Sequence, residues 1–228
     1  MFKFMKNKVL VIVAHPDDEI LGVGGTILKH VASGDEVSVC VLGDGELSRE
    51  GATLSDVEKR KQQINRVAKE LGLTDLFIED FSDNRFDSVE LLDIVKKIEI
   101  IINSVHPNII YTHHAHDLNI DHRLTCQAVL TACRPQPGLS VSKILAFETL
   151  SSTEWQIKDC SMIFCPNEYN VIDEYIDKKI KILSIYKDEV KNWPHPRSLE
   201  GVKILAQYRG MEVGHNYVEA FQVIRSIK

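Results

Sequence analysis

The sequence predicts a Rossmann-like α/β fold: a mostly parallel sheet with helices on both faces and an embellished C-terminal third. Two observations predict it. Continuous β-branched segments typical of buried strands alternate with segments of helical periodicity, and polar residues gather directly after two of the strand-like segments. Such alternation builds parallel sheets, because each helix returns the chain to start the next strand in the same direction. The length of 228 residues favours one domain, residues 1–228.

The first two thirds of the chain carries the regular part of this pattern. Strands are expected at 8–14, 36–42, 76–78 and 108–112. Helices are expected at 22–29 with an extension towards Gly34, and at 55–71, 90–105 and 121–133. Ser55 and Glu58 fit a capping box at the start of the second helix, and Gly72 fits its end.

The C-terminal third is less regular and begins after the proline-rich break at 135–138. Strands are expected at 144–149, 162–164 and 217–224, and helices at 168–186 and 198–210. We assign this part to the same domain, because the chain contains no other linker-like segment.

Composition excludes several classes of protein. Hydrophobic residues make up 44% and charged residues 26%, which is the balance of a globular chain and not of a disordered one. The net charge of −6 argues against the broad basic surface of a nonspecific nucleic-acid binder. No apolar run approaches a membrane span, and the N-terminal segment lacks a signal-peptide cleavage pattern. Five cysteines in no paired pattern favour reduced thiols and a cytoplasmic protein.

Two polar clusters lie at expected strand ends, where open parallel sheets bind their ligands. Residues 15–19, HPDDE, follow the first strand. The second cluster, within ten positions after 109–112, contains His113, His114, His116, Asp117, Asn119, Asp121 and His122. Together they suit a zinc site of two histidines and one carboxylate with an open position. Taken alone, the first cluster has a solvated turn as its alternative, and the second has a surface loop. The spacing of the second cluster does not show which of its four histidines would bind the metal.

The motifs match a known family. Residues 11–19, VIVAHPDDE, followed by the glycines at 22, 24 and 25, resemble the first motif of the PIG-L/LmbE-like zinc-dependent N-acetylglucosaminyl deacetylases, and Asp121-His122 resembles the end of the second. The resemblance extends along essentially the whole chain, through Arg60, Asp83-Asn84, residues 194–198, Arg209-Gly210 and residues 219–221.

The resemblance implies a hydrolase that removes the acetyl group from an N-acetylglucosamine-type amino sugar linked to a nucleotide, lipid or glycan. It implies zinc ligands at His15, Asp18 and His122, with iron(II) or another divalent ion as alternatives. Asp17 becomes the general base, because zinc lowers the pKa of a water to about 7 and a neighbouring carboxylate then accepts the proton. The resemblance leaves the oligomeric state open, because family members are monomers, trimers or hexamers; a homo-oligomer, trimer or hexamer, is compatible with it.

The sequence departs from the family at Asn119, where several members carry a histidine. Asn119 would act as a neutral donor to the oxyanion, unless His116 or His195 supplies that group. Asp121 is expected either to orient an imidazole or to cap the following helix.

Substrate contacts rest on weaker signals. The resemblance places Arg60 and Asp83 against the sugar or its aglycone, and the proline-flanked loop suggests that His195 and Arg197 reach over the site. Trp155 and Trp193 are expected in the core or an interface rather than stacked on a sugar. The competing functions are a metal-dependent amidase or esterase on another small molecule, and a sugar- or nucleotide-binding module without catalysis.

Overall fold

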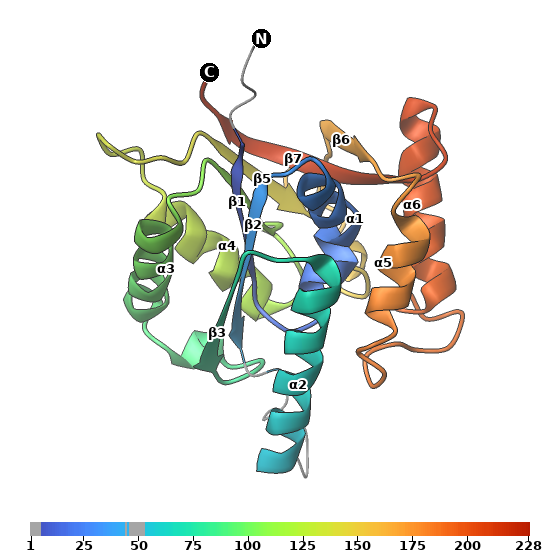
Figure 1. Cartoon of the computed structure of the whole chain (residues 1–228), viewed down its shortest axis with the longest axis horizontal. Coiled ribbons are helices and arrows are strands. Elements are labelled where there is room, and N and C mark those ends of the chain that lie inside the picture. Colours follow the sequence, from blue (N-terminus) through green and yellow to red (C-terminus); the bar gives the residue numbers. More distant parts are fainter. Residues whose placement is uncertain (1–5, 44, 46–52) are drawn as a thin grey trace.

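The computed structural model describes residues 6–43, 45 and 53–228 and contains a single seven-stranded sheet. The strands lie in the order β3-β2-β1-β4-β5-β7-β6 (Figure 1). Their bounds are β1 Lys8–Val13, β2 Glu36–Gly43, β3 Asp75–Phe81, β4 Ile109–His113, β5 Lys143–Phe147, β6 Glu168–Val171 and β7 Val218–Ser226. The helices are α1 Asp18–Ala32, α2 Leu54–Leu71, α3 Leu91–Val105, α4 Ile120–Ala132, α5 Ile176–Leu183 and α6 Leu199–Val213.

The sheet is mostly parallel, as the sequence predicts. Strands β1 to β5 pair in parallel, whereas β7 runs antiparallel to both β5 and β6. The first five strands therefore end at one edge of the sheet, which brings the loop after β1 beside the loop after β4.

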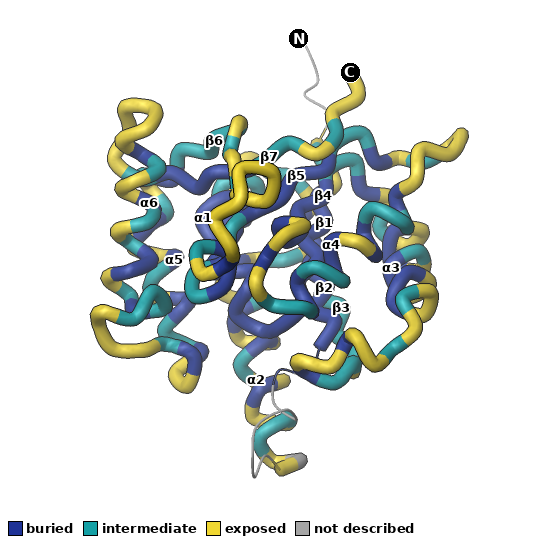
Figure 2. Tube along the Cα trace, turned by 180° about the vertical axis from the view of Figure 1, so that it is seen from behind, coloured by how far each residue is buried: buried dark blue, intermediate teal, exposed yellow. Residues whose placement is uncertain are grey.

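Helices cover both faces of the sheet, with α3 and α4 on one side and α1, α2, α5 and α6 on the other (Figure 1). Alternate residues of β1 pack into the hydrophobic cores on the two faces of the sheet. Val9, Val11 and Val13 belong to the core under α1 and α2, and Leu10 and Ile12 to the core under α3 and α4. This explains why the β1 sequence is apolar without alternation. Figure 2 shows the central strands β1, β2, β4 and β5 mostly buried, whereas β3 and β6 at the two edges of the sheet are intermediate.

Two glycines of α1 allow the close packing of this layer. A Cβ atom at Gly22 would lie 2.2 Å from the ring of Phe147, and one at Gly25 would lie 2.8 Å from the side chain of Ile172. The glycine motif therefore lets α1 approach the sheet, as expected, and does not form a phosphate loop.

The expected elements of the C-terminal third need two corrections. Residues 162–164 lie in a turn region and are not a strand. The expected helix at 168–186 is wrong in its first half, because Glu168–Val171 pairs with β7 as strand β6 and only Ile176–Leu183 is helical. Residues 168–171 form a strand because they pair with the edge of β7 in antiparallel orientation. The paired segments are about fifty residues apart in the sequence, so local periodicity does not reveal this contact.

Helix starts also differ from expectation. The cap of α2 is Thr53, whose side chain accepts from Asp56 N while Asp56 accepts from Thr53 N, so the capping box lies two residues before Ser55 and Glu58. Gly72 ends that helix in the left-handed conformation, as predicted. Helix α1 begins at Asp18, four residues earlier than expected. No helix in the described ranges is long and apolar enough to span a bilayer.

Candidate metal centre and active site

The two polar clusters meet at the carboxyl edge of the sheet. The first follows β1, and Asp18 opens α1. The second follows the neighbouring strand β4, and His122 lies in the first turn of α4. Both clusters are largely buried, so neither is a solvated turn or a surface loop.

His15, Asp18 and His122 form a potential metal-ligand group, each offering one atom within 4.8 Å of the others. Asp18 Oδ2 lies 3.5 Å from His15 Nδ1 and 3.3 Å from His122 Nε2. Asp18 Oδ1 and His122 Nε2 are buried and make no hydrogen bond with the described residues. Buried polar atoms without partners are rare in folded proteins. Lone pairs that converge without protein donors fit a divalent cation, and the two-histidine, one-carboxylate set fits zinc.

The electrostatics of these residues favour positive charge at the same point. Burial opposes charge on both imidazoles, yet hydrogen bonds to Asp121 and Asp18 raise the pKa of His15 to about 10. Asp18 and Asp117 likewise raise the pKa of His122 to about 9 against the effect of burial. The pKa of Asp18 is lowered well below its usual value, since His122 and His113 outweigh its desolvation. A bound cation would satisfy the same carboxylate.

Carboxylates outside the ligand group orient the two imidazoles. His15 Nε2 lies 2.9 Å from Asp121 Oδ2 and 3.0 Å from Asp83 Oδ1, which leaves Nδ1 facing Asp18. His122 Nδ1 lies 3.2 Å from Asp117 Oδ1, which leaves Nε2 facing Asp18. Such carboxylate–histidine pairs are typical around protein metal ions, because they fix the ring and its tautomer.

His15, Asp83 and Asp121 also lie close enough together to be considered as ligands. Asp121 Oδ1 accepts from Phe86 N at 3.0 Å, and Asp121 Oδ2 is occupied by His15 Nε2. We therefore interpret this second group as the acceptors that orient His15. Asp121 is not the cap of α4, because that cap is Asn119, whose side chain accepts from Asp121 N at 2.8 Å.

The geometry separates the four histidines of the second cluster. His113 stacks on His122 at 3.9 Å, its Nε2 accepts from Ala14 N, and burial together with His122 lowers its pKa to about 4. His114 Nε2 lies 2.8 Å from the carbonyl oxygen of Met162, and His116 packs against the ring of His114. Only His122 directs a ring nitrogen at both His15 and Asp18.

Asp17 lies beside the ligand group in a strained backbone conformation. Its φ of 113° is in the left-handed region, which costs a non-glycine residue roughly 1–3 kcal/mol. Asp17 N donates to Glu19 Oε2 at 2.9 Å, and Arg197 donates to Asp17 Oδ2 at 3.0 Å. Burial raises the pKa of Asp17 to about 8, although Arg197 opposes the shift. A buried carboxyl group with a pKa near neutrality suits proton transfer.

The four residues expected to contact substrate differ in their burial and in the side chains that they contact. Asp83 is 7% exposed and contacts His15, while Arg197 bridges Asp17 and Glu189. Arg60 lies within α2 rather than at its start, is 1% exposed and pairs with Glu189, so it is not at the surface. His195 is half-buried, and its Nδ1 accepts from Arg197 N at 3.1 Å.

The two tryptophans are more exposed than a core position allows. Trp155 and Trp193 are 52% and 58% exposed, so of the two expected positions the core is wrong, and a place in an interface stays a prediction. The Trp155 ring meets the ring of His195 edge-on at 5.7 Å. Both indoles are therefore accessible close to the loop that carries His195 and Arg197.

Sequence reasoning missed the roles of three acids. Asp117 was visible in the second cluster, and its contact with His122 is of the kind expected around metal-binding histidines. Glu19 was visible in HPDDE but had no assigned partner; its carboxylate accepts from Tyr186 and from Asp17 N. Glu189 had no local signal, because its partners Arg60 and Arg197 come from other segments.

Comparison with known proteins agrees with this site. Residues 10–133 match the family model PIG-L, described as GlcNAc-PI de-N-acetylase. The match covers more than half of the chain and includes all three potential metal ligands. This chain belongs to the PIG-L family. The prediction from the HPDDE and Asp-His motifs is thus confirmed.

Two relatives extend the similarity along the chain. The uncharacterized deacetylase YaiS of Escherichia coli (strain K12) is 29% identical over 188 residues, which are 80% of this chain and 91% of that protein. The diacetylchitobiose deacetylase of Thermococcus kodakarensis is 26% identical over 231 residues, 97% of this chain and 84% of that protein.

Solved structures share the fold. The N,N'-diacetylchitobiose deacetylase of Pyrococcus horikoshii has a TM-score of 0.78 at 20% identity, covering 96% of this chain and 84% of its own. The 4-carboxy-2-hydroxymuconate hydratase GalB of Pseudomonas putida has a TM-score of 0.76 at 21% identity and covers 98% of both chains. Because a hydratase shares this fold, fold likeness alone does not specify a deacetylase.

Proposed function

We propose that this PIG-L family member is a zinc-dependent N-deacetylase that hydrolyses the acetamido group of an N-acetylglucosamine-type sugar. The observation that carries the proposal is the buried group of His15, Asp18 and His122 with the Asp17 carboxylate beside it. Relatives named as deacetylases of diacetylchitobiose and of N-acetylglucosaminyl malate support the substrate class.

His15, Asp18 and His122 would hold the metal. When bound, zinc supplies a Lewis acid that makes water acidic and polarises the acetamide carbonyl. Asp17 takes the proton of the attacking water as its oxygen adds to the carbonyl carbon. It then delivers that proton to the sugar nitrogen as the C–N bond breaks, which yields acetic acid and the free amine; the acid then passes its proton to the amine or to solvent. Arg197 occupies Asp17 Oδ2, so we assign the proton transfer to Oδ1.

His195 is our choice for the donor to the developing oxyanion. Its Nδ1 accepts a hydrogen bond from Arg197 N, so a neutral ring carries its proton on Nε2 and can donate it. Asn119 is less suited, because its Oδ1 caps α4 and its Nδ2 donates to Asn84 Oδ1 at 3.2 Å. Asp83 and Arg60 act on the site through His15 and Glu189, in place of the sugar or aglycone contacts implied by the resemblance. Arg197 acts through Asp17, in place of the reach over the site that its proline-flanked loop suggested.

Acetate release tests the activity, measured on N-acetylglucosamine, N,N'-diacetylchitobiose and N-acetylglucosaminyl conjugates of malate, inositol and lipid. We expect turnover of at least one conjugate, loss on chelation, and recovery with zinc. Iron(II) and other divalent ions are compared in the same recovery step. Turnover of simple amides or esters without sugar turnover would favour the broader amidase or esterase, and zinc binding without any turnover would favour a sugar-binding module.

We also propose a homo-oligomer, a trimer or hexamer, in the cytoplasm. Exposed apolar side chains at Ile204, Tyr208 and Met211 recur at helical spacing on α6 and would suit contact with another copy. The free thiols of all five cysteines agree with a reducing compartment. Sedimentation equilibrium of the full chain tests the first proposal, and fractionation of the source cell tests the second.

A further inference from the structure

A series of buried side chains connects Asp17 to parts of the chain that carry no metal ligand. Arg197 NH1 donates to Asp17 Oδ2 at 3.0 Å and lies 3.7 Å from Glu189 Oε2. The other oxygen of Glu189 pairs with the guanidinium of Arg60, on α2. Glu189 therefore lies between two arginines, one of which holds the catalytic carboxylate.

A second set of contacts leads from Arg60 back to the backbone of Asp17. The guanidinium of Arg60 lies 5.7 Å from the centre of the Tyr186 ring. Tyr186 donates its hydroxyl proton to Glu19 Oε1 at 2.7 Å, and Glu19 Oε2 accepts from Asp17 N at 2.9 Å. Arg60 is thus connected to Asp17 by two routes. One runs through Glu189 and Arg197 to the Asp17 side chain, and the other through Tyr186 and Glu19 to the Asp17 backbone N–H.

Most of these groups are buried, and Arg197 is partly exposed. Asp17, Glu19, Arg60 and Tyr186 are each at most 2% exposed, and Glu189 is 8% exposed. The series contains two guanidinium groups, those of Arg60 and Arg197, and three carboxyl groups, those of Asp17, Glu19 and Glu189. Arg197 contacts both Asp17 and Glu189, so loss of the Glu189 charge leaves Asp17 as the acid nearest to its guanidinium among the contacts described.

The hydrogen bonds of Arg197 show what Glu189 prevents. Its Nε donates to the carbonyl oxygen of Leu150 at 3.3 Å, and its NH1 lies between Asp17 and Glu189. Within the described ranges, this is a one-point contact that uses only Oδ2 of Asp17. A guanidinium without a second acid tends to form two parallel hydrogen bonds with a carboxylate, which would occupy both of its oxygens.

We propose that Glu189 is a positioning residue for Asp17, because it shares the Arg197 guanidinium and so keeps one Asp17 oxygen available. This inference rests on the proposed function, in which that oxygen carries the proton. When the Glu189 charge is lost, the Arg197 guanidinium donates hydrogen bonds to both carboxylate oxygens of Asp17. The metal ligands stay in place, since Glu189 contacts none of them in the described part of the chain.

The test compares Glu189→Gln, Glu189→Asp and Glu219→Gln in the full-length protein. Glu219 is a matched control, because it is 5% exposed and pairs with Lys179 at 2.7 Å without contacting Asp17. We expect Glu189→Gln to lower kcat for acetate release by about 10–100-fold, the scale of a small misplacement of a catalytic group. KM and zinc stoichiometry should stay unchanged, and Glu189→Asp should recover most of kcat. Glu219→Gln should lower the melting temperature and leave kcat unchanged.

Crystal structures of the wild type and Glu189→Gln provide the measurement that does not depend on turnover. In the variant, we expect the Arg197 guanidinium to donate to both oxygens of Asp17. An unmoved Arg197, or a kcat loss equal to that of Glu219→Gln, would overturn the positioning role. If the wild type releases no acetate from any sugar, the proposed function fails, and the two crystal structures still decide whether Glu189 sets the position of Arg197.

Discussion

The two ends of the central sheet each hold a histidine beside a carboxylate, and the pairs differ in what the second ring nitrogen meets. At the amino end, His30 Nδ1 lies 2.7 Å from Asp35 Oδ2, and His30 Nε2 lies 3.1 Å from the Tyr111 hydroxyl. At the carboxyl end, His122 Nδ1 lies 3.2 Å from Asp117 Oδ1, and neither buried ring nitrogen of His122 makes a hydrogen bond with a described residue.

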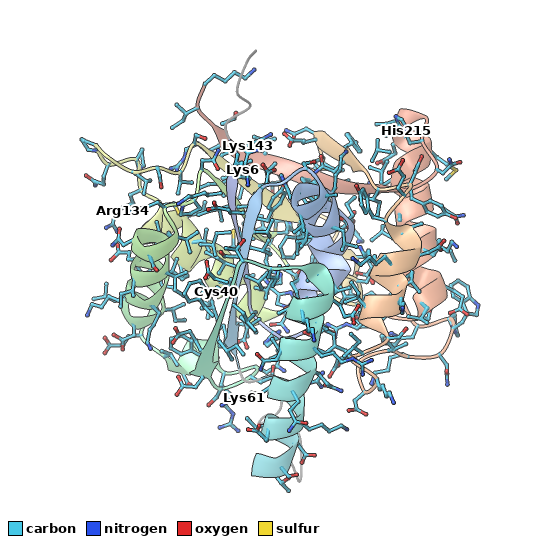
Figure 3. The ribbon with its side chains drawn as sticks, in the orientation of Figure 1. Lys6, Cys40, Lys61, Arg134, Lys143 and His215 are labelled. Carbon is cyan, nitrogen blue, oxygen red and sulfur yellow. The ribbon has the colours of Figure 1, made fainter. Side chains whose placement is uncertain are left out.

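The amino end of the sheet also holds a cavity, beside the histidine whose two ring nitrogens both have partners. A cavity of about 520 Å³ lies at the amino end and is lined by Lys6, Asn7, Thr26, Lys29, His30, Ser33, Asp35 and Asn170. Figure 3 labels Lys6 and Lys143, the first residue of β5, at this end of the molecule. Its histidine has a partner for each nitrogen, so it needs no ligand. Open volume alone is therefore a weaker sign of a metal site than a buried histidine whose ring nitrogens lack hydrogen-bond partners.

Removal of a metal ligand should have the largest effect. His15→Ala deletes one of three ligands, so we expect about one zinc per chain in the wild type and almost none in the variant, with acetate release lost. His30→Ala is the matched control at the amino end of the sheet, and this variant should keep both its bound zinc and its acetate release. Elemental analysis of the two purified variants decides the point. Equal zinc in both would place the metal elsewhere.

Removal of the base should affect turnover and spare the metal. Asp17→Asn keeps the shape of the side chain and loses its capacity to accept a proton, so kcat should fall by about 10²–10⁴-fold. Zinc content should match the wild type, because the three ligands remain. A variant with full kcat would remove Asp17 from the mechanism, and a variant without zinc would make it part of the metal centre instead.

The sequence was a good guide wherever function is encoded in short segments. His15, Asp17 and Asp18 follow one buried strand, and β4 lies next to that strand, so the resemblance and the parallel sheet together predicted the meeting of His15 with His122. The first four helices were found for the same reason, because their apolar periodicity and glycine stops are local features.

Long-range pairing limited the rest of the prediction. Strand β6 depends on β7 about fifty residues later, so its own four residues were read as helix. Arg60 resembles a solvated helix residue until Glu189, 129 positions away, is brought to its guanidinium. Similarly, Arg197 was expected over the substrate, and only the folded chain directs it to Asp17, 180 positions earlier.

The carboxylates beside the two histidines provide a more sensitive comparison. Asp117→Asn weakens the group that orients His122, and changes of this kind lower metal affinity by about 10–100-fold. Asp35→Asn makes the same chemical change beside His30 and should leave zinc affinity unchanged. Competition with a coloured chelator measures both affinities. Equal losses would show that the effect comes from general destabilisation and not from the orientation of a ligand.

The smallest effect is expected from the amino end itself. His30→Ala removes hydrogen bonds to Asp35 and Tyr111, which should lower the free energy of unfolding by about 1–2 kcal/mol. Urea unfolding of the zinc-loaded protein measures this loss, and kcat should stay at the wild-type value because no contact of His30 reaches the ligand group within the described residues. A fall in kcat larger than the unfolded fraction explains would show that strand β4, which carries both Tyr111 and His113, transmits changes from one end of the sheet to the other.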